Sequence, residues 1–402
     1  MRWLGFIALL WFSLPGTAAE RKLVLAHYMP WYESKAVSDR WGWHWTMNKF
    51  QPDKVVQGRR ELASHYRPLI GAYDSNDPHA LECHALLMKF AGIDGVILDW
   101  YGIRKHNDYA VIHRNSQHFI KHLKRAGLKF AVCYEDQTVK HMVADKVLPT
   151  AQDVPHGQEV MRWLQTNWFR DPAYVQNDDR PLLLVFGPQH FTAAQWPQLT
   201  NGLRPAPATY ALPHLTSRLP GSGAFGWPPV HDGKRLAPAD WNQYLNDLDR
   251  RAAKGESIIA AVFPKFHDIY REAGLHDSYG YLDDQNGQTF EQTLDRAWRG
   301  KARIIQIATW NDFGEGTIIE PTQEFGYRYL ESLQGRRAKI DPAFHFIPAD
   351  LRLPVMLYQL RKHDPKIKGL DPHYDAIAQQ LFSNRTVEAR KTLLAMWNRV
   401  KP

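Results

Sequence analysis

One stretch in the last third of the chain constrains the fold most: residues 303–321, which read RIIQIATWNDFGEGTIIEP. It begins with an apolar, Ile-rich run that is typical of a buried strand. It continues into a segment that places two carboxylates, Asp312 and Glu315, three positions apart among aromatic residues, an asparagine and glycines. A buried strand that leads directly into an acidic loop is typical of the C-terminal face of an α/β barrel, where that architecture carries its functional groups.

Short apolar runs alternate with longer amphipathic ones along the rest of the chain. Clear strand candidates are residues 23–28, 95–102, 128–134, 181–186 and 257–263, and weaker ones are residues 208–212 and 224–227. Helical patterns between them cover residues 78–90, 108–126, 157–169, 238–253 and 290–299. Such alternation predicts a parallel β/α architecture. Eight units in one domain of this length favour a closed (β/α)8 barrel over a doubly wound sheet.

Helical patterns also continue after the last strand, at residues 327–334, 355–362, 374–382 and 387–400. We interpret the first as the last helix of the barrel and the others as an extension packed on its outside, since no Gly/Ser-rich linker separates them. The predicted organisation is therefore a catalytic barrel over residues 20–336 and a C-terminal helical extension over residues 337–402.

The first 19 residues have the composition of a secretory signal peptide. Arg2 supplies a basic start, residues 3–14 are mostly apolar, and Thr17-Ala18-Ala19 is a small-residue cleavage site. The apolar run is too short for a transmembrane helix. We therefore expect an exported protein, periplasmic or extracellular, without an integral membrane segment after cleavage.

Charge and cysteine content exclude several classes of protein. The formal net charge is +8, but the basic residues are scattered, so we expect no nucleic-acid partner. The two cysteines, Cys83 and Cys133, could form a disulfide or remain two separate buried thiols. Metal-ligand and nucleotide-binding motifs are absent from the sequence, so we predict no metal and no cofactor. We expect a monomer.

The predicted strand ends share one property: each releases a polar or charged group beside an aromatic ring. This combination suits a sugar, because carboxylates and amides bind hydroxyl groups while flat rings stack on the apolar face of a pyranose. A phosphate site would instead favour glycines and helix N-termini. The candidate substrate-binding residues are His27, Tyr28, Trp31, Tyr32, Asp99, Trp100, Tyr101, Glu135, Asp136, Trp310 and Asn311.

Asp312 and Glu315 are the candidate catalytic pair. Cleavage of a glycosidic bond needs a protonated acid at the leaving oxygen and a second carboxylate on the sugar side. Two like charges close together raise the pKa of one group, which keeps a proton on the acid near neutral pH. The alternative is that the pair caps a following helix or forms salt bridges within the loop.

Two further features have two interpretations each. The insertion that contains Trp41, Trp43 and Trp45 forms either a lid that faces the glycan or a locally packed cluster. Glu320 fits a role in ordering the loop better than a role in the reaction, and His267 and Tyr279 are weaker candidates for substrate contact.

Three segments carry a family resemblance: HYMPWY at residues 27–32, GVILDWYG at 95–102 and TWNDFGEGTIIEP at 309–321. They resemble glycoside hydrolase families 71 and 99, which comprise α-1,3-glucanases, endo-α-mannosidases and endo-α-mannanases. The resemblance implies a (β/α)8 barrel and a retaining endo-hydrolase that needs no metal. It implies that Glu315 donates the proton and that Asp312 acts as a base on the sugar's 2-hydroxyl, through a 1,2-anhydro sugar.

The chain departs from family 99 at one catalytic position. Family 99 has Glu where this chain has Asp312, and Asp in a Trp-Asn-Asp-aromatic-Gly-Glu run resembles family 71 more closely. The shorter side chain reaches about one carbon–carbon bond less far. The resemblance therefore does not assign the substrate of either family to this chain.

The leading hypothesis is an exported endo-hydrolase of an α-linked oligo- or polysaccharide: α-mannan, α-glucan or a bacterial exopolysaccharide. A second hypothesis is a non-catalytic carbohydrate-binding or polysaccharide-processing protein on the same barrel, expected if the two carboxylates are splayed apart or held in salt bridges. A third is a metal-dependent hydrolase or deacetylase, which a tightly bound metal would support.

Overall fold

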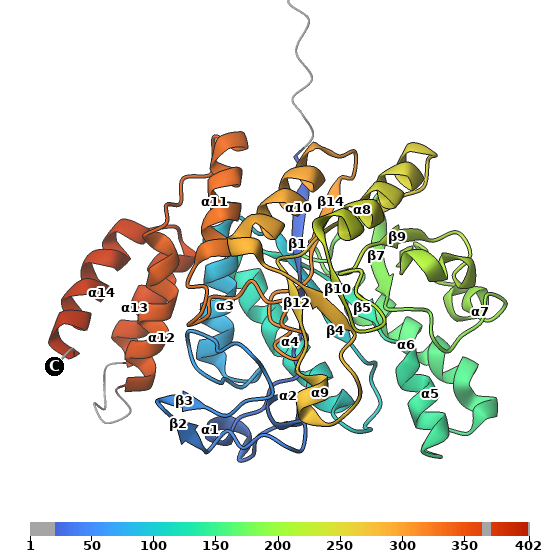
Figure 1. Ribbon diagram of the computed structural model, residues 1–402, viewed down its shortest axis with the longest axis horizontal. Coiled ribbons are helices and arrows are strands. Elements are labelled where there is room, and N and C mark those ends of the chain that lie inside the picture. The colour runs from blue at the N-terminus through green and yellow to red at the C-terminus, as the bar shows by residue number, and fades with distance from the viewer. Residues whose placement is uncertain (1–20, 364–370, 401–402) are drawn as a thin grey trace, which may run out of the picture.

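Eight parallel strands form a closed barrel in the computed structural model, which describes residues 21–363 and 371–400 (Figure 1). In chain order they are β1 (Leu23–Tyr28), β4 (Gly95–Trp100), β5 (Lys129–Tyr134), β7 (Arg180–Val185), β8 (Ala208–Ala211), β9 (Gly223–Phe225), β11 (Ile258–Val262) and β14 (Ile304–Ile307). Each pairs in parallel with the next, and β14 pairs with β1 to close the ring. The predicted fold class is confirmed, including the two weakest strands. The predicted signal peptide lies outside the described residues.

Helices cover the outside of this barrel (Figure 1). They are α3 (Pro78–Ala91), α4 (Tyr109–Ala126), α5 (Gln137–Ala144), α6 (Asp153–Asn167), α7 (Trp196–Thr200), α8 (Pro238–Ala253), α10 (Gln288–Arg299) and α11 (Arg328–Ile340). The connection between β8 and β9 departs from this pattern, because it contains a 3-10 helix at Pro213–Arg218 in place of an α-helix. None of the described helices is long and apolar enough to span a membrane.

Local sequence signals fix the ends of these helices, as α3 illustrates. Its first residue is Pro78, whose missing N–H costs nothing at that position. The Asp77 carboxylate accepts the N–H of His79 at 3.0 Å and caps the start. Gly92, with φ of 83°, ends the helix in the left-handed region. The helix then presents an almost fully buried face, including Leu81, to the barrel.

Several small elements gather at the C-terminal ends of the strands. They lie at the lower end of the molecule in Figure 1: α1 (Lys35–Ser38), α2 (Trp43–Thr46), β2 (Val55–Val56), β3 (Arg59–Arg60) and α9 (Tyr270–Ala273). A second small sheet is formed by β10 (Lys234–Leu236), β13 (Gly280–Leu282) and β12 (Phe266–His267), and β6 (Gln176–Asn177) adds to the edge of β7. The long insertion after β1 therefore lies at the face where a barrel carries its active site.

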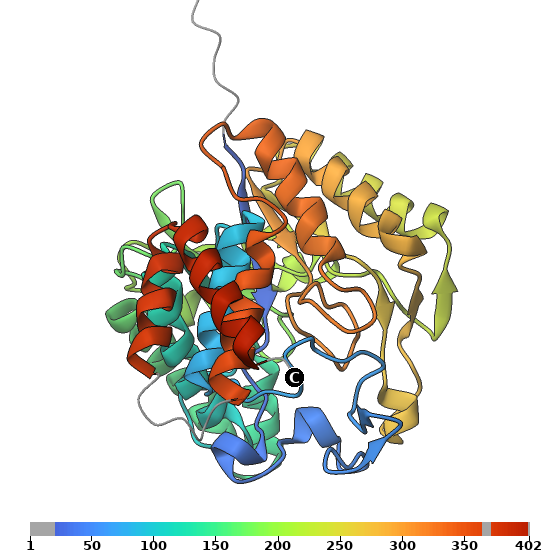
Figure 2. The same cartoon turned by 90° about the vertical axis from the view of Figure 1, so that its left-hand side faces the viewer.

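The C-terminal helices are α12 (Leu353–His363), α13 (Asp371–Phe382) and α14 (Thr386–Val400). α12 packs on α3, and α13 and α14 pack on α12 (Figure 2, red). Buried leucines such as Leu360 and Leu393 fill the contacts. The two cysteines are free and buried, Cys83 in α3 and Cys133 in β5, so the interpretation as separate thiols is correct.

A close backbone approach in the barrel wall yields a stability prediction. A β-carbon on Gly95 would lie 2.3 Å from the carbonyl oxygen of Lys129, its partner on β5. We expect Gly95→Ala to lower the free energy of unfolding by about 1–3 kcal/mol, measured as a lower Tm by circular dichroism. The control is Gly335→Ala in α11, where a β-carbon meets nothing within 4 Å, so its Tm should stay equal or rise. Equal Tm values for wild type and Gly95→Ala would contradict this packing.

Candidate active site

The loop after β14 folds back on itself and so fixes its acidic residues. The N–H of Trp310 donates to the carbonyl of His27 on β1 at 2.7 Å. The N–H of Thr309 donates to the carbonyl of Thr317 at 2.9 Å, and the N–H of Glu320 donates to that of Trp310, also at 2.9 Å. Backbone hydrogen bonds therefore hold both ends of the loop against the barrel.

Asn311 anchors the loop from within. Its amide accepts the N–H of Met29 at 2.8 Å and donates to the carbonyl of Met29 at 2.9 Å. The hydroxyl of Tyr32 donates to the carbonyl of Asn311 and accepts the N–H of Phe313. Both side chains are fully buried. The expectation that Asn311 and Tyr32 contact substrate is corrected: they support the loop from behind.

A buried polar network continues behind this wall. The Glu320 carboxylate accepts the hydroxyl of Tyr73 at 2.9 Å and lies 3.2 Å from Nε2 of His84. Nδ1 of the same histidine is hydrogen-bonded to the Tyr28 hydroxyl. The Trp310 ring packs edge-on against His84. Tyr28 and Trp310 are therefore also removed from the substrate-contact set, and Glu320 has the loop-ordering position expected of it.

A cavity of about 410 Å³ opens between this loop and the other strand ends. Seven of the predicted site residues line it: His27, Trp31, Asp99, Tyr101, Glu135, Asp312 and Glu315. Residues that the sequence analysis did not select also line it, among them His44, Gln137, Phe186, Gln189, Trp227 and Tyr270. Tyr279, one of the weaker candidates, lies on the wall, whereas His267 stacks on His65.

Asp312 and Glu315 lie in this one cavity and are held by hydrogen bonds. The N–H of Glu315 donates to Oδ1 of Asp312 at 2.9 Å, and the N–H of Asp312 donates to the Thr309 hydroxyl. Nε1 of Trp227 donates to the Glu315 carboxylate at 3.3 Å. Within residues 21–363 and 371–400, no Lys or Arg forms an ion pair with either acid. The alternative in which loop salt bridges neutralise the pair is therefore wrong.

The pKa values of the two acids are raised to different extents by their surroundings. Burial raises the pKa of Asp312 to about 6, although the N–H of Glu315 favours the charged form. Burial and the charge of Asp312 raise the pKa of Glu315 well above its ordinary value. The surroundings therefore favour the protonated form of Glu315 and help to keep the charged form of Asp312. This is the division of roles that glycosidic cleavage requires.

A second acidic pair lies on the opposite wall, at the ends of β4 and β5. Asp99 is only 2% exposed, and its Oδ1 has no hydrogen-bond partner. Burial and the charge of Glu135 raise the pKa of Asp99 well above its ordinary value. Burial raises the pKa of Glu135 to about 7, while the Gln137 amide donates to it. The cavity therefore contains four carboxyl groups.

Two predicted contacts point away from this cavity. The Trp100 indole donates to Nδ1 of His113 at 3.1 Å and packs among rings of the helix layer. Asp136 accepts the N–H groups of residues 189–191 at 2.7, 3.0 and 2.9 Å. Trp100 thus fills the space between β4 and the helices, and Asp136 fixes the loop after β7. Both are corrected from substrate contacts to structural residues.

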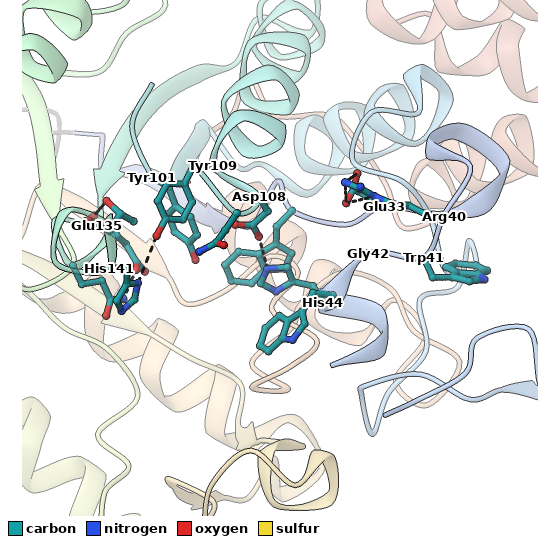
Figure 3. Close-up of a pocket in the computed structure, with 15 residues that line it drawn as sticks. Glu33, Arg40, Trp41, Gly42, His44, Tyr101, Asp108, Tyr109, Glu135 and His141 are labelled. Atoms are coloured by element: carbon teal, nitrogen blue, oxygen red, sulfur yellow. Dashed lines mark hydrogen bonds and ion pairs between the residues drawn. The ribbon is translucent and has the colours of Figure 1, made fainter. Parts of the chain in front are cut away.

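An adjoining groove of about 650 Å³ continues from the cavity, and Figure 3 shows the residues around it. The two spaces share Trp31, Trp43, His44, Tyr101, Glu135 and Gln137. His44 stacks on Trp31 at 4.1 Å between ring centroids and bonds to Asp108 at 3.0 Å. In the aromatic insertion, Trp43 lines the groove, whereas Trp45 is fully buried and belongs to the local packing.

One group of side chains in the described part of the chain could hold a metal ion. His27, Asp99 and Cys133 each offer a donor atom, and these atoms lie within 4.8 Å of one another. Imidazole, carboxylate and thiolate ligands are a set that zinc accepts. Of the three, His27 and Asp99 line the cavity that also holds Glu315.

Comparison with known proteins points to glycan-processing proteins. Residues 230–333 match the sequence model of a family described as "Glycosyltransferase WbsX", a range that includes both candidate catalytic acids. An "Uncharacterized protein WxcX" from two strains of Xanthomonas campestris pv. campestris is 22% identical over 374 residues, covering 82% of this chain and 51% of that protein. The chain thus spans about half the length of these curated relatives.

The fold also has solved relatives. The GH99 endo-alpha-mannosidase from Bacteroides thetaiotaomicron covers 80% of this chain with a TM-score of 0.59, at 17–18% identity and over 97–98% of its own length. A "glycoside hydrolase-like protein" covers 81% of this chain and 97% of its own, with a TM-score of 0.55 at 13% identity. These structures confirm the resemblance to family 99. At such identities the likeness shows the fold.

The adjacent acids Glu135 and Asp136 provide a test of these assignments. We expect Asp136→Ala to lower the free energy of unfolding by about 1–3 kcal/mol, because it leaves buried N–H groups unpaired. Glu135→Gln should leave the Tm close to that of wild type, because this side chain faces the cavity. Thermal unfolding followed by circular dichroism measures both. A large loss of Tm in Glu135→Gln, with none in Asp136→Ala, would reverse the assignments.

Proposed function

We propose that this chain is a glycoside hydrolase of α-linked glycans, with Glu315 as general acid/base and Asp312 as the base that assists at the sugar. The observation that carries the proposal is the acidic pair on one loop: the two groups share a cavity, and their surroundings favour a proton on Glu315 and a charge on Asp312. Two carboxyl groups with separated pKa values are the working parts of this reaction.

In the proposed first step, Glu315 gives its proton to the leaving oxygen as the C1–O bond breaks. Asp312 takes the proton of the sugar's 2-hydroxyl, whose oxygen bonds to C1 and forms a 1,2-anhydro sugar. In the second step, Glu315 takes a proton from water while the water oxygen bonds to C1 and the C1–O2 bond of the anhydro sugar breaks. Asp312 then returns its proton to the 2-oxygen. Two displacements at C1 retain the anomeric configuration.

The hydrogen bonds around the pair support these roles. Trp227 donates to Glu315 and orients its carboxyl group. The N–H of Glu315 donates to Asp312 and stabilises its charge. Tyr101 and Trp31 provide rings on the cavity wall, where a pyranose face can stack.

The groove supports an endo mode of action. The cavity has the size of a typical small-ligand site, and the groove continues it through six shared residues. A glycan that extends past the cleaved bond can therefore lie along Trp31, Trp43 and Tyr101. Candidate substrates are α-mannan, α-glucan and bacterial exopolysaccharides. Because residues 1–19 resemble a signal peptide, we also propose that the protein is exported.

A second candidate is a glycosyltransferase, which the description of the matching family suggests. A nucleotide-sugar donor carries a diphosphate, which proteins bind with Arg, Lys, a metal ion or helix N-termini. Among the described residues, no Lys or Arg lines the cavity that holds Asp312 and Glu315. The non-catalytic alternative expects splayed or salt-bridged acids, whereas both acids line one cavity and, among the described residues, neither is paired with Lys or Arg. Both observations favour hydrolysis.

The main prediction concerns the proposed acid. We expect Glu315→Gln to lower hydrolysis by about 10² to 10⁴-fold, because the amide cannot donate the proton. The measurement is reducing-end release from α-mannan, α-1,3-glucan and bacterial exopolysaccharides. Glu388→Gln, an exposed position on α14, is the matched control and should keep wild-type activity. Circular dichroism checks that both variants fold.

Two outcomes would contradict the assignment. Wild-type activity in Glu315→Gln would show that Glu315 is not the general acid. Release of nucleotide from nucleotide sugars in the presence of a glycan acceptor, without reducing ends, would favour the transferase.

The pH dependence follows from the ionisation of the pair. Asp312 must be charged, so activity should rise as pH increases through about 6, the pKa of that group. At higher pH activity should fall as Glu315 loses its proton, which gives a bell-shaped profile of kcat/KM. The two limbs report the coupled pair. An optimum well below pH 5, with no rising limb near 6, would contradict the ionised state of Asp312.

A further inference from the structure

We propose that Asp99 and Glu135 act as a charge filter in this cavity, which admits neutral and amino sugars and rejects glycans that carry acid groups. This inference rests on the proposed function and names the substrate class of the same site.

The walls of the cavity are acidic in composition although the chain as a whole is positive. The full sequence has a formal charge of +8, yet four carboxyl groups line the cavity and, among the described residues, no Lys or Arg does. In the adjoining groove the single Arg that lines it, Arg40, forms bonds of 2.9 and 3.0 Å with Glu33, as Figure 3 shows. Its charge is therefore already compensated.

The hydrogen-bonding capacity of the wall points to a ligand with donors. Oδ1 of Asp99 is buried, lines the cavity and has no partner. Burying a polar atom without a hydrogen-bond partner costs the full desolvation free energy of that atom. Hydroxyl and ammonium groups of a sugar can donate to it. Carboxylate, sulfate and phosphate groups offer only acceptors when ionised, and they carry the same sign of charge.

Other titratable groups face the filter from the surrounding elements. Asp99 and Glu135 interact electrostatically with each other and with four further acids: Asp312, Glu315, Asp108 and Asp136. The histidines and tyrosines that line the cavity and the adjoining groove are His27, His44, His141, Tyr101, Tyr109, Tyr270 and Tyr279. Burial lowers the pKa of His27 to about 3, so this imidazole is neutral. Asp108 bonds to His44. Among the described residues, no Lys or Arg lines the cavity to offset an added anion.

An anionic sugar therefore meets carboxyl groups of its own sign in this cavity, and no Lys or Arg among the described lining residues offsets the added charge. The ammonium group of an amino sugar has the opposite interaction, because carboxylates attract it. A neutral sugar is affected little.

The test uses ligands that differ only in charge. Tetragalacturonate and its methyl ester form one α-linked pair; an α-1,4-linked galactosamine tetrasaccharide and its N-acetylated form make the other. Binding is titrated by the fluorescence of the wild-type protein, since Trp31, Trp43 and Trp227 line the cavity. At about pH 7.5 we expect the methyl ester to bind at least about tenfold more tightly than the acid. The free amine should bind at least as tightly as its N-acetylated form.

Variants test whether Asp99 and Glu135 cause this difference in affinity. In Asp99→Asn/Glu135→Gln the difference between acid and ester should disappear at every pH, whereas Glu388→Gln should keep the wild-type difference. Equal affinity of acid and ester in the wild type, or no binding by any of the four ligands, would overturn the proposal. So would a difference that the double variant retains at unchanged size.

The result is independent of catalysis. If the filter is observed and no glycosidic bond is cleaved in any polysaccharide, the hydrolase proposal fails and the filter stands. If glycans are cleaved but acid and ester bind alike, the filter fails and the hydrolase proposal stands.

Discussion

Four carboxyl groups share one cavity whose described walls carry no Lys or Arg, and the rest of the site follows from this constraint. Charged carboxylates are unfavourable away from water and beside one another, so their pKa values rise. Because the neighbours differ, the rise is unequal: Asp312 has backbone N–H groups that favour its charge, and Glu315 has the charge of Asp312 beside it. One loop thereby supplies a base and an acid at the same pH.

This arrangement requires a rigid support, because like charges move apart unless they are held. The loop is tied to β1 through Asn311 and Met29, and its far side is tied to a lysine. Nζ of Lys265, which is only 1% exposed, donates to the carbonyl of Ile318 at 2.9 Å. Aromatic rings surround this ammonium group, and cation–π attraction stabilises it there. The acids are thus placed by contacts that do not reach substrate.

The sequence predicted the barrel and the acidic loop well, because both depend on local patterns. It predicted the residues of the cavity wall less well, because the candidates at strand ends were chosen without regard to the alternation of side chains between the two faces of a strand. Neighbouring residues of a strand point to opposite faces: His27 and Asp99 face the barrel interior, and Tyr28 and Trp100 face the helices. Strict alternation would have excluded the latter two.

Other wall residues could not be predicted in this way. Trp227 follows the weakest strand, and His44 belongs to a helical turn of the insertion after β1. Their positions depend on contacts between distant segments, such as the stacking of His44 on Trp31 and the bond from Trp227 to Glu315. Applying the strand-end rule to residues 224–227 would have selected Trp227. No pattern around residue 44 indicates where its ring lies.

The proposed reaction requires that Glu315 keeps its proton near neutral pH while Asp312 is ionised. Infrared difference spectroscopy of the carboxyl groups, comparing wild type with Glu315→Gln at about pH 7, measures this directly. The wild type should show a protonated carboxyl band that is missing in the variant. If the variant instead lacks only an ionised carboxylate band that the wild type shows, Glu315 is already deprotonated. That result would contradict its assignment as the acid.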